Sequence, residues 1–547
     1  MIEITPWLEY FSGNKKIYKE LKKIKNKGIL PSDFTSPLFL LKNKFIAKNG
    51  LGHNKFNEIT LHAIAQSYVN LLQKSIGDLQ NQYILLASDG FDNEYEKYLD
   101  YLQDVFNAYR IKVLRFKDSL PVTKSFLLYV INKTKNINTT IYISKYSVLK
   151  SLTSVEFIND KGANFLSNEI QNIYNMMQEI DPFSCHIFYD DYFKLDSERL
   201  LSEYADEILK ANHNEGGNKL LKIGIVTDNT SNAFVKKILG RNDISYTLIN
   251  KTIKKEKPNK IYLPLWKNQK FDYLLKFSYD HKKVFLYAKK SNSLCFGYSL
   301  VDISNLVAVY LNFLNTTQST NENFSSSNLI ISSKASKEYL IDAVAQKFAL
   351  QSKTEIILDF NEIVNLPNVL YFNEINEFYL SSNIKYCDEM LPVSTIVDML
   401  NYYKTQNLNF AELYKNLTNN LQKFDLNTFE INVEKYNKIN TFENEIIKLK
   451  RISLFEISNI ENLQQFELEK EKYISKIHFN EYEWLLIKYS KETKKLIFFV
   501  HEPSSNKQLI FKKLKKHFCK NIFLYFLDEK NNESIESNEE QLENENS

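Results

Sequence analysis

The stretch YILLASDGFDNEYEKYLDYLQDVFNAYRIKVLRF, residues 83–116, contains every element of one α/β unit. Its first residues, 83–87, are an apolar run typical of a buried strand, and a polar loop follows them. A helix is indicated next by apolar residues at helical spacing: Tyr98, Leu99, Leu102, Val105 and Phe106. A second apolar run at 111–116 predicts a strand parallel to the first.

The same order of elements recurs twice. Residues 221–249, LKIGIVTDNTSNAFVKKILGRNDISYTLI, again indicate strand, helix and strand, and Gly240 stands where a helix stop is expected. Residues 328–350, NLIISSKASKEYLIDAVAQKFAL, are a third unit of this kind. Strands that alternate with helices of this length predict right-handed crossovers and mainly parallel, mixed sheets.

Beyond about residue 430 the order changes. Residues 483–502, EWLLIKYSKETKKLIFFVHE, predict two strands joined by a loop, and a Lys-rich helix follows near residues 507–516. A chain of 547 residues is too long for one hydrophobic core. We therefore expect three consecutive α/β domains at 1–183, 184–304 and 305–427, a small α+β domain at 428–525, and a disordered acidic tail at 526–547.

The composition separates a basic body from this tail. Hydrophobic residues make up 44% of the chain, which is ample for several cores, and the abundance of Lys, Asn and Ile is typical of an AT-rich bacterial genome. Residues 528–547 carry eight acidic residues and one lysine, so the net charge of +4 leaves about +11 for the rest. This excess could attract anions, although lysines that only solvate the surface explain it more simply.

The cysteines and the termini indicate a compartment. Cys185, Cys295, Cys387 and Cys519 show no CxxC spacing, which argues against a disulfide framework or structural zinc and favours a reducing environment. The N-terminus lacks a signal-peptide pattern, and no apolar run approaches the ~20 residues of a membrane span. Aromatic residues fall at core spacings, so we expect no nucleic-acid binding. We expect a cytoplasmic protein without a transmembrane segment.

Two segments resemble a known family. Residues 52–72, GHNKFNEITLHAIAQSYVNLL, are similar to GTNRMNxYTVxxATQGLAxYL of the phosphohexomutases, the phosphoglucomutases and phosphomannomutases. They keep Asn54, Asn57, Thr60 and Gln66. Residues 398–417, DMLNYYKTQNLNFAELYKNL, resemble the family's EMAAYYKxxGKTLxDxLxxL. The resemblance runs through most of residues 7–525, and it implies three related α/β domains, a smaller α+β domain and transfer of a phosphoryl group between sugar positions.

The loops that carry the family's chemistry depart from its pattern. Members use a phosphoserine in TASHNP and a Mg²⁺ held by the aspartates of ATDPDADRLG. Ser144, in IYISKYSVLKSL at 141–152, aligns with that serine but lacks the His-Asn-Pro that should follow. The metal loop falls on FLYAKKSNSLCFGYS at 285–299, where Lys290, Asn292 and Leu294 replace the aspartates and Cys295 an arginine. These side chains cannot hold Mg²⁺, which needs hard oxygen ligands.

Two further loops have changed in the same way. The sugar loop FGFEESxGY aligns with FYLSSNIKY at 378–386, so its glutamates become Ser381 and Ser382. Tyr379 and Lys385 replace its glycines. In the first domain, GTAGLRG is replaced by LKNKFIA at 41–47, with Ile46 at the arginine.

The phosphate loop keeps more of its character. The family pattern RPSGTEPKxRxY aligns without a gap with KYSKETKKLIFF at 488–499. Cationic and hydroxyl groups remain for an anion, and we name four residues as vestigial phosphate-binding candidates: Lys488, Ser490, Thr493 and Lys495. Lys491 at the glycine and Ile497 at the second arginine weaken the backbone nest, so lysines exposed to water are the alternative.

Several loops have lost the residues that carry the family's chemistry, whereas the helices and strands between these loops keep their pattern. This combination predicts a pseudoenzyme. We expect a catalytically inactive phosphohexomutase-like protein that is a structural or interaction subunit of a larger protein assembly, with no catalytic residue, metal or cofactor. Two alternatives stay open. One is a phosphoglucomutase/phosphomannomutase-type phosphotransferase with an atypical site, which needs a phosphorylated Ser144 and a divalent metal bound elsewhere, since Lys290 as a fixed cation could not also organise the phosphoserine oxygen. The other is a sugar-phosphate or anion sensor that uses residues 488–495.

Overall fold

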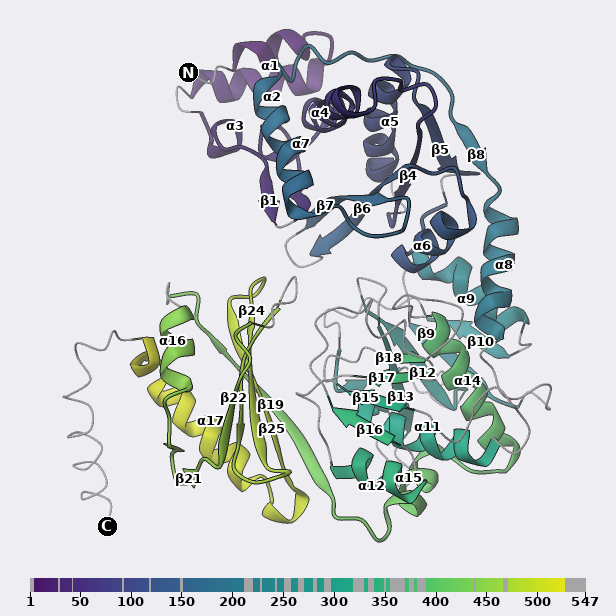
Figure 1. Cartoon of the computed structure of the whole chain (residues 1–547), viewed down its shortest axis with the longest axis vertical. Helices are drawn as coiled ribbons and strands as arrows, with labels where there is room; N and C mark the ends of the chain where they lie inside the picture. Colours follow the sequence, from purple (N-terminus) through teal and green to yellow (C-terminus); the bar gives the residue numbers. More distant parts are fainter. Residues whose placement is uncertain are drawn as a thin grey trace. The chain divides into compact units, whose positions relative to one another are not determined.

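A computed structural model of the chain describes residues 4–27, 30–41, 43–90, 93–117, 120–147, 151–210, 220–226, 229–241, 244–249, 257–263, 270–278, 283–289, 297–317, 329–332, 339–348, 351–354, 369–372, 378–380, 390–435, 439–465 and 471–526. Contacts divide the chain into two compact units (Figure 1). The first unit holds the first two sheets, and the second unit holds the third and fourth sheets.

The first sheet is eight-stranded and mixed, in the order β1-β2-β7-β6-β4-β5-β8, with β3 beside β2. Its strands are β1 (Phe39–Leu41), β2 (Lys44–Asn49), β3 (Lys55–Phe56), β4 (Tyr83–Ser88), β5 (Lys112–Phe116), β6 (Thr139–Ser147), β7 (Leu152–Asn159) and β8 (Phe193–Leu195). Helix α5 (Asn93–Ala108) joins β4 to the parallel strand β5, which confirms the unit predicted at residues 83–116. Strand β7 is antiparallel to both β6 and β2.

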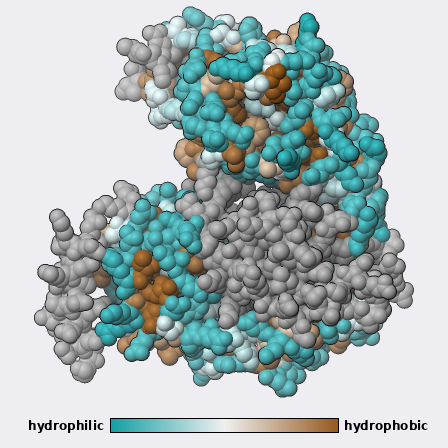
Figure 2. All heavy atoms as spheres, viewed as in Figure 1, coloured by the Kyte–Doolittle hydropathy of each residue, from teal (hydrophilic) through white to brown (hydrophobic). Residues whose placement is uncertain are grey.

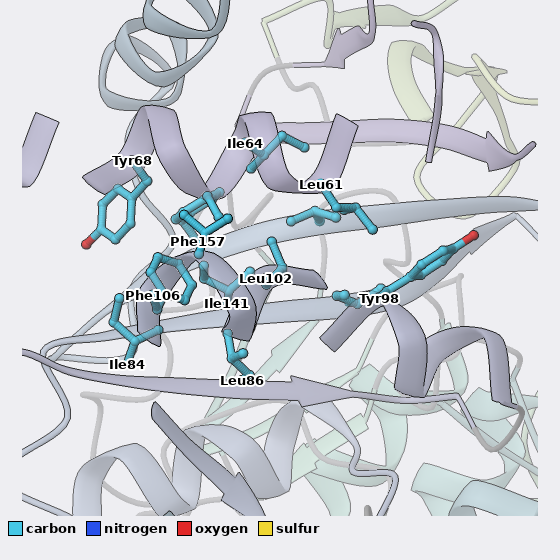
Figure 3. Close-up of a cluster of buried hydrophobic side chains, with 14 of the residues drawn as sticks. Leu61, Ile64, Tyr68, Ile84, Leu86, Tyr98, Leu102, Phe106, Ile141 and Phe157 are labelled. Carbon is cyan, nitrogen blue, oxygen red and sulfur yellow. The ribbon is translucent and has the colours of Figure 1, made fainter. Parts of the chain in front are cut away.

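Helices cover both faces of this sheet. On one face lie α4 (Glu58–Ser75), α5 and α7 (Ser167–Glu179), and α6 (Lys124–Lys133) lies on the other (Figure 1). Apolar residues of α4 and α5 interdigitate with those of the strands: Leu61, Ile64, Tyr68, Tyr98, Leu102, Phe106, Ile84, Leu86, Ile141 and Phe157 (Figure 3). The helical stripe recognised in the sequence is thus the buried face of α5.

The segment that resembles the phosphohexomutases builds the start of α4. The Asn57 side chain accepts a hydrogen bond from the Thr60 amide at 3.1 Å, and it donates to the carbonyls of Gly50 and Gly52 at 2.9 Å each. Gly52 has φ +126°, and a Cβ there would lie 2.4 Å from the Asp33 carbonyl oxygen, so glycine is required. These residues therefore fix a loop and a helix N-terminus.

Three short N-terminal helices, α1 (Thr5–Tyr10), α2 (Lys15–Asn26) and α3 (Ser32–Thr35), form a separate cluster around Trp7. Beyond the first sheet, α8 (Ser197–Leu209) and α9 (Asn229–Arg241) accompany a six-stranded sheet in the order β10-β9-β12-β13-β14-β11. Its strands are β9 (Lys222–Val226), β10 (Ser245–Leu248), β11 (Lys260–Ile261), β12 (Tyr273–Phe277), β13 (Val284–Lys289) and β14 (Tyr298–Leu300). Because β9, α9 and the parallel strand β10 occur in order, the second predicted unit is confirmed, although Gly240, expected as the helix stop, lies inside α9, which ends at Arg241.

The third sheet has the order β16-β15-β17-β18, with strands β15 (Leu329–Ser332), β16 (Gln351–Thr354), β17 (Val369–Phe372) and β18 (Phe378–Leu380). Its helices are α11 (Ile303–Thr317), α12 (Tyr339–Lys347), α14 (Met390–Thr405) and α15 (Phe410–Thr418). Strand β15 is parallel to β16 across α12, so the third predicted unit is confirmed as well.

The fourth sheet is antiparallel, in the order β19-β25-β24-β23-β22. Its strands are β19 (Phe424–Asn432), β22 (Asn459–Asn462), β23 (Glu471–His478), β24 (Trp484–Ser490) and β25 (Lys495–Pro503). The remaining elements are the hairpin β20 (Arg451–Ile452) and β21 (Phe455–Glu456), the helices α16 (Ile439–Ile446) and α17 (Leu509–Asn521), and the 3-10 turns η4 (Ser504–Asn506) and η5 (Ile522–Phe526). This confirms the α+β module with its Lys-rich helix.

The architecture is the expected one, mixed α/β sheets followed by an antiparallel sheet with helices. The domain boundaries at residues 183, 304 and 427 stay predictions, and β8, which follows the first of them, pairs with β5. The tail falls outside the described residues, apart from Phe526.

Of the helices that are described, none is long and apolar enough to cross a membrane. Hydrophilic side chains cover most of the described surface on the face shown in Figure 2, and hydrophobic ones gather there in a few patches.

Candidate functional site

Ser144, the residue aligned with the phosphoserine, lies inside a strand of the first sheet. In the antiparallel β6–β7 ladder it stands directly opposite Ser154, which is buried. The two hydroxyl oxygens are 3.0 Å apart, so one donates a hydrogen bond to the other. A serine hydroxyl becomes a strong nucleophile when an adjacent base takes its proton. A second hydroxyl supplies no such activation.

The row of side chains that contains Ser144 crosses three strands on one face of the sheet. Strand β2 pairs with β7 so that Ile46 lies opposite Ser154, and the row reads Ile46, Ser154, Ser144. Ile46 is buried, and it occupies the position of the arginine in the family's first loop. The row therefore offers two hydroxyl groups and an aliphatic side chain.

The neighbouring row, about 7 Å along the strands, carries charge. Here Lys44, Glu156 and Tyr142 lie opposite one another. The Glu156 carboxylate binds Lys44 Nζ at 2.9 Å and, at 2.5 Å, the Nζ of Lys124 at the start of α6. Lys124 Nζ also donates to Asn164 Oδ1 at 3.0 Å. A buried carboxylate thus bridges two lysines next to Ser144.

The electrostatics of this cluster determine which group is charged. Burial alone would raise the pKa of Glu156, but the charges of Lys124 and Lys44 outweigh burial and hold the pKa well below its usual range. Glu156 is therefore ionised, and it serves as the counterion of both lysines. An anion placed near Ser144 would compete with Glu156 for these two cations.

Asp89, at the carboxyl end of β4, fixes the backbone on both sides of Ser144. Its carboxylate oxygens accept hydrogen bonds from the Lys145 amide at 3.0 and 3.1 Å. Its own amide donates to the Ile143 carbonyl at 3.1 Å. Because the side chain is buried and used in this way, Asp89 holds β6 in its extended course through Ser144.

The four phosphate-binding candidates lie together on the β24–β25 hairpin. Ser490 is paired with Lys495, and Lys488 lies two residues along on the same face. Lys488 is completely buried, with Nζ 2.5 Å from Glu471 Oε2 and 4.6 Å from the Tyr473 ring centroid. Its ammonium group therefore interacts with its own domain.

The rest of the hairpin is also engaged internally. Thr493 donates to Ser490 Oγ through its amide at 3.3 Å and its hydroxyl at 2.8 Å. Lys494 has φ 54°, in the left-handed region typical of tight turns, and Lys495 Nζ donates to Glu430 Oε2 at 2.7 Å. The structure brings the four candidates together, but the two lysines bind different carboxylates. Their role in phosphate binding stays a prediction.

The remaining loops lie largely outside the described residues. Residues 290–296 and 381–389 contain the substituted metal-loop and sugar-loop positions, namely Lys290, Asn292, Leu294, Cys295, Ser381, Ser382 and Lys385. Tyr379 belongs to β18. In the part of the chain that is described, no group of His, Cys, Asp or Glu side chains is arranged to hold a metal ion.

Sequence reasoning missed Glu156 and its lysines. The signal was present, because Glu156 interrupts the apolar strand segment SVEFI, and a carboxylate in a buried strand requires a charged partner. The partners themselves come from β2 and α6, far away in the sequence.

No protein-family model matches the sequence, and no curated protein matches it. Solved structures do. A Thermus thermophilus structure assigned as a phosphomannomutase is 12% identical with a TM-score of 0.59, covering 89% of this chain and 99% of that chain. A phosphoglucomutase/phosphomannomutase family protein from Burkholderia thailandensis is 10% identical with a TM-score of 0.58, over 89% and 97%. The open form of the Paramecium phosphoglucomutase parafusin is 10% identical with a TM-score of 0.54, over 89% and 96%. The chain therefore has the phosphohexomutase fold.

Proposed function

We propose that this chain is a catalytically inactive phosphohexomutase-like protein that serves as a structural or interaction subunit of a larger, cytoplasmic protein assembly. The observation that carries the proposal is the placement of Ser144. It lies within the β6–β7 ladder with its hydroxyl bonded to Ser154, and Glu156 of the next row is the counterion of Lys44 and of Lys124 in α6. The Ser144 hydroxyl and the two lysines thus have their partners without a phosphoryl group.

A phosphoryl group on Ser144 would be unfavourable in this setting. It would add a charge of about −1.5 to −2 at neutral pH. That charge would stand beside the buried Ser154 and one row from the ionised Glu156, whose repulsion would offset part of the attraction of the two lysines. It would have to compete with Glu156 for Lys44 and Lys124.

The fold is equally that of active mutases, so an atypical phosphotransferase is the alternative to test. Ser144→Ala and Ser154→Ala are matched variants, because each removes one half of the same hydroxyl pair. Conversion of glucose 1-phosphate to glucose 6-phosphate is followed in both variants and in the wild type, and mass spectrometry examines Ser144 in protein from the native cell. We expect no turnover and no phosphoserine. Turnover that Ser144→Ala abolishes and Ser154→Ala retains would refute inactivity.

The assembly is tested separately. Tagged protein is purified gently from its own cells, and the bound proteins are identified by mass spectrometry. Stoichiometric protein partners are expected, and a monomeric protein without any of them would refute the subunit role.

A sugar-phosphate sensor is a second candidate because one hairpin carries Lys488, Ser490, Thr493 and Lys495 together. Calorimetry with glucose 1-phosphate and glucose 6-phosphate tests this function. Heat that is lost in Lys495→Gln would favour the sensor, whereas no heat at millimolar ligand would exclude it.

A further inference from the structure

The segment between α7 and β8 is anchored to the surface of α4 and α5; we call residues 181–192 the strap (Figure 1). Its anchors are regularly spaced. The His186 amide donates to Gln66 Oε1 at 3.2 Å, and the Phe188 amide donates to the Asp104 carbonyl at 2.8 Å. Two residues later, the Asp190 carbonyl accepts from Gln103 Nε2 at 2.7 Å. Every second residue thus binds the helices, as in an extended strand.

The backbone groups of the residues between these anchors do not bind the helices. Within the described part of the chain, the backbone groups of Ile187 and Tyr189 have no hydrogen-bond partner. The apolar side chains of this edge are unusually exposed: Ile187 36%, Phe188 56%, Tyr189 72% and, in the adjoining edge strand β8, Phe193 57%. Exposed apolar groups gathered on a firmly held backbone are typical of an interaction site.

The surroundings of the strap are acidic. Asp190 and Asp191 are exposed on it, and Glu58, Asp100 and Asp104 belong to the helices beneath. Burial, together with the charges of Asp100 and Glu58, raises the pKa of Asp104 to about 6, which shows how closely these carboxylates are grouped. The nearby cation Arg115 is already bound to Asp100, at 2.6 Å.

A buried polar atom beside these carboxylates is also unsatisfied. His62 is buried, and among the described residues its Nε2 has no hydrogen-bond partner. It lies 4.0 Å from Asp104 Oδ2, which is too far for a hydrogen bond. The helices under the strap therefore combine grouped carboxylates with one buried polar atom, His62 Nε2, that has no hydrogen-bond partner among the described residues.

We propose that the strap is a docking site for an extended, basic segment of a partner protein. Such a segment would pair with the open backbone edge at Ile187 and Tyr189, pack apolar side chains on Phe188 and Phe193, and place lysine or arginine side chains among the carboxylates. Charge complementarity selects this occupant, because the exposed carboxylates of Asp100, Asp190 and Asp191 would attract a basic strand and repel an acidic one. The inference rests on the proposed role as an interaction subunit, and it names the surface and the partner's chemistry.

The first test uses the purified full-length protein and two fluorescent peptides, one of alternating lysine and valine and one of alternating glutamate and valine. We expect binding of the lysine peptide only, weakened when salt is raised to about 0.15 M. The triple variant Tyr189→Ala/Asp190→Asn/Asp191→Asn should lose at least about tenfold in affinity, or roughly 1.4 kcal/mol. Tyr262→Ala, at an exposed tyrosine that directly follows β11, is the control and should bind normally. Equal binding of both peptides, or unchanged binding by the triple variant, would overturn the proposal.

The second test separates this inference from the proposed function. A photo-crosslinking amino acid replaces Tyr189 in the native cell, and the crosslinked peptide is sequenced. A single Lys- or Arg-rich segment of another protein supports the proposal. A crosslink to an acidic segment, or to a second copy of this chain, overturns it. Partners that co-purify equally with the wild type and the triple variant leave the subunit role intact but refute the strap as its docking site.

Discussion

Replacement of Glu156 by glutamine removes one charge from the first sheet while keeping the size of the side chain. Glu156 binds Lys44 Nζ at 2.9 Å and Lys124 Nζ at 2.5 Å. Each contact corresponds to about 6 kcal/mol of Coulomb energy at an effective dielectric constant of ~20, most of which is offset by the cost of desolvating the charges. Lys124, partly exposed, can turn towards water, whereas Lys44 is buried. We therefore expect a loss of about 3–5 kcal/mol in the free energy of unfolding of this sheet.

Native-state hydrogen exchange of peptides that cover β2 and β7 is the appropriate assay, because a chain of several domains does not unfold in two states. Glu203→Gln is the matched control. Glu203 forms an exposed pair with Arg199, with 3.9 Å between Nε and Oε1, and its loss should cost less than about 1 kcal/mol.

The pH dependence gives a second measurement of the same charge. Because the folded pKa of Glu156 is lowered, its contribution to stability is complete above its unfolded pKa of ~4.5 and is lost as the pH falls below that value. The difference between wild type and Glu156→Gln should therefore shrink as the pH falls from about 6 to about 3. A loss of protection below about 1 kcal/mol at neutral pH, or a difference that grows in acid, would refute the role assigned to Glu156.

Four further predictions concern single residues. Ser144→Ala and Ser154→Ala should each lower the stability of the β6–β7 ladder by about 1 kcal/mol, measured by hydrogen exchange, because each breaks the same hydrogen bond. Lys488→Met should leave any glucose 1-phosphate binding unchanged in calorimetry, since its ammonium group binds Glu471; loss of binding would show that Lys488 contacts the anion. Asn57→Ala should destabilise the start of α4 by about 2 kcal/mol, seen as faster exchange there, because a cap and two loop contacts disappear. Asp104, whose folded pKa is raised to about 6, lowers stability once the pH rises through that value, so Asp104→Asn should raise the melting temperature at pH 7 but not at pH 4.

The order of elements could be predicted from the sequence because apolar spacing carries it. The stripe from Tyr98 to Phe106 marks the buried face of α5 without any knowledge of its partners. The resemblance of residues 52–72 was equally informative, since Asn57 and Thr60 form local hydrogen bonds within a few residues of one another. Local sequence patterns are thus enough to predict features that are stabilised by residues close together in the sequence.

The candidate site depended on partners that are distant in the sequence. In β24, Lys488 and Ser490 alternate with Ile487 and Tyr489, which is typical of a strand with one face in water, yet Lys488 is buried by groups of β23 and β25. Likewise, Ser144 can be aligned with a loop serine, but its place in a ladder is decided by β7. The alignment identified the position and could not determine its pairing.

The Lys44–Glu156–Lys124 cluster has a consequence for how the folded state responds to the cell. In a protein whose cations await a phosphate, each ligand molecule that binds adds to stability, so the population of folded protein follows the metabolite concentration. Here the counterion of both lysines is Glu156, a residue of the same chain. Its local concentration is therefore the same under all growth conditions. We expect the first sheet to be equally stable in starved and well-fed cells.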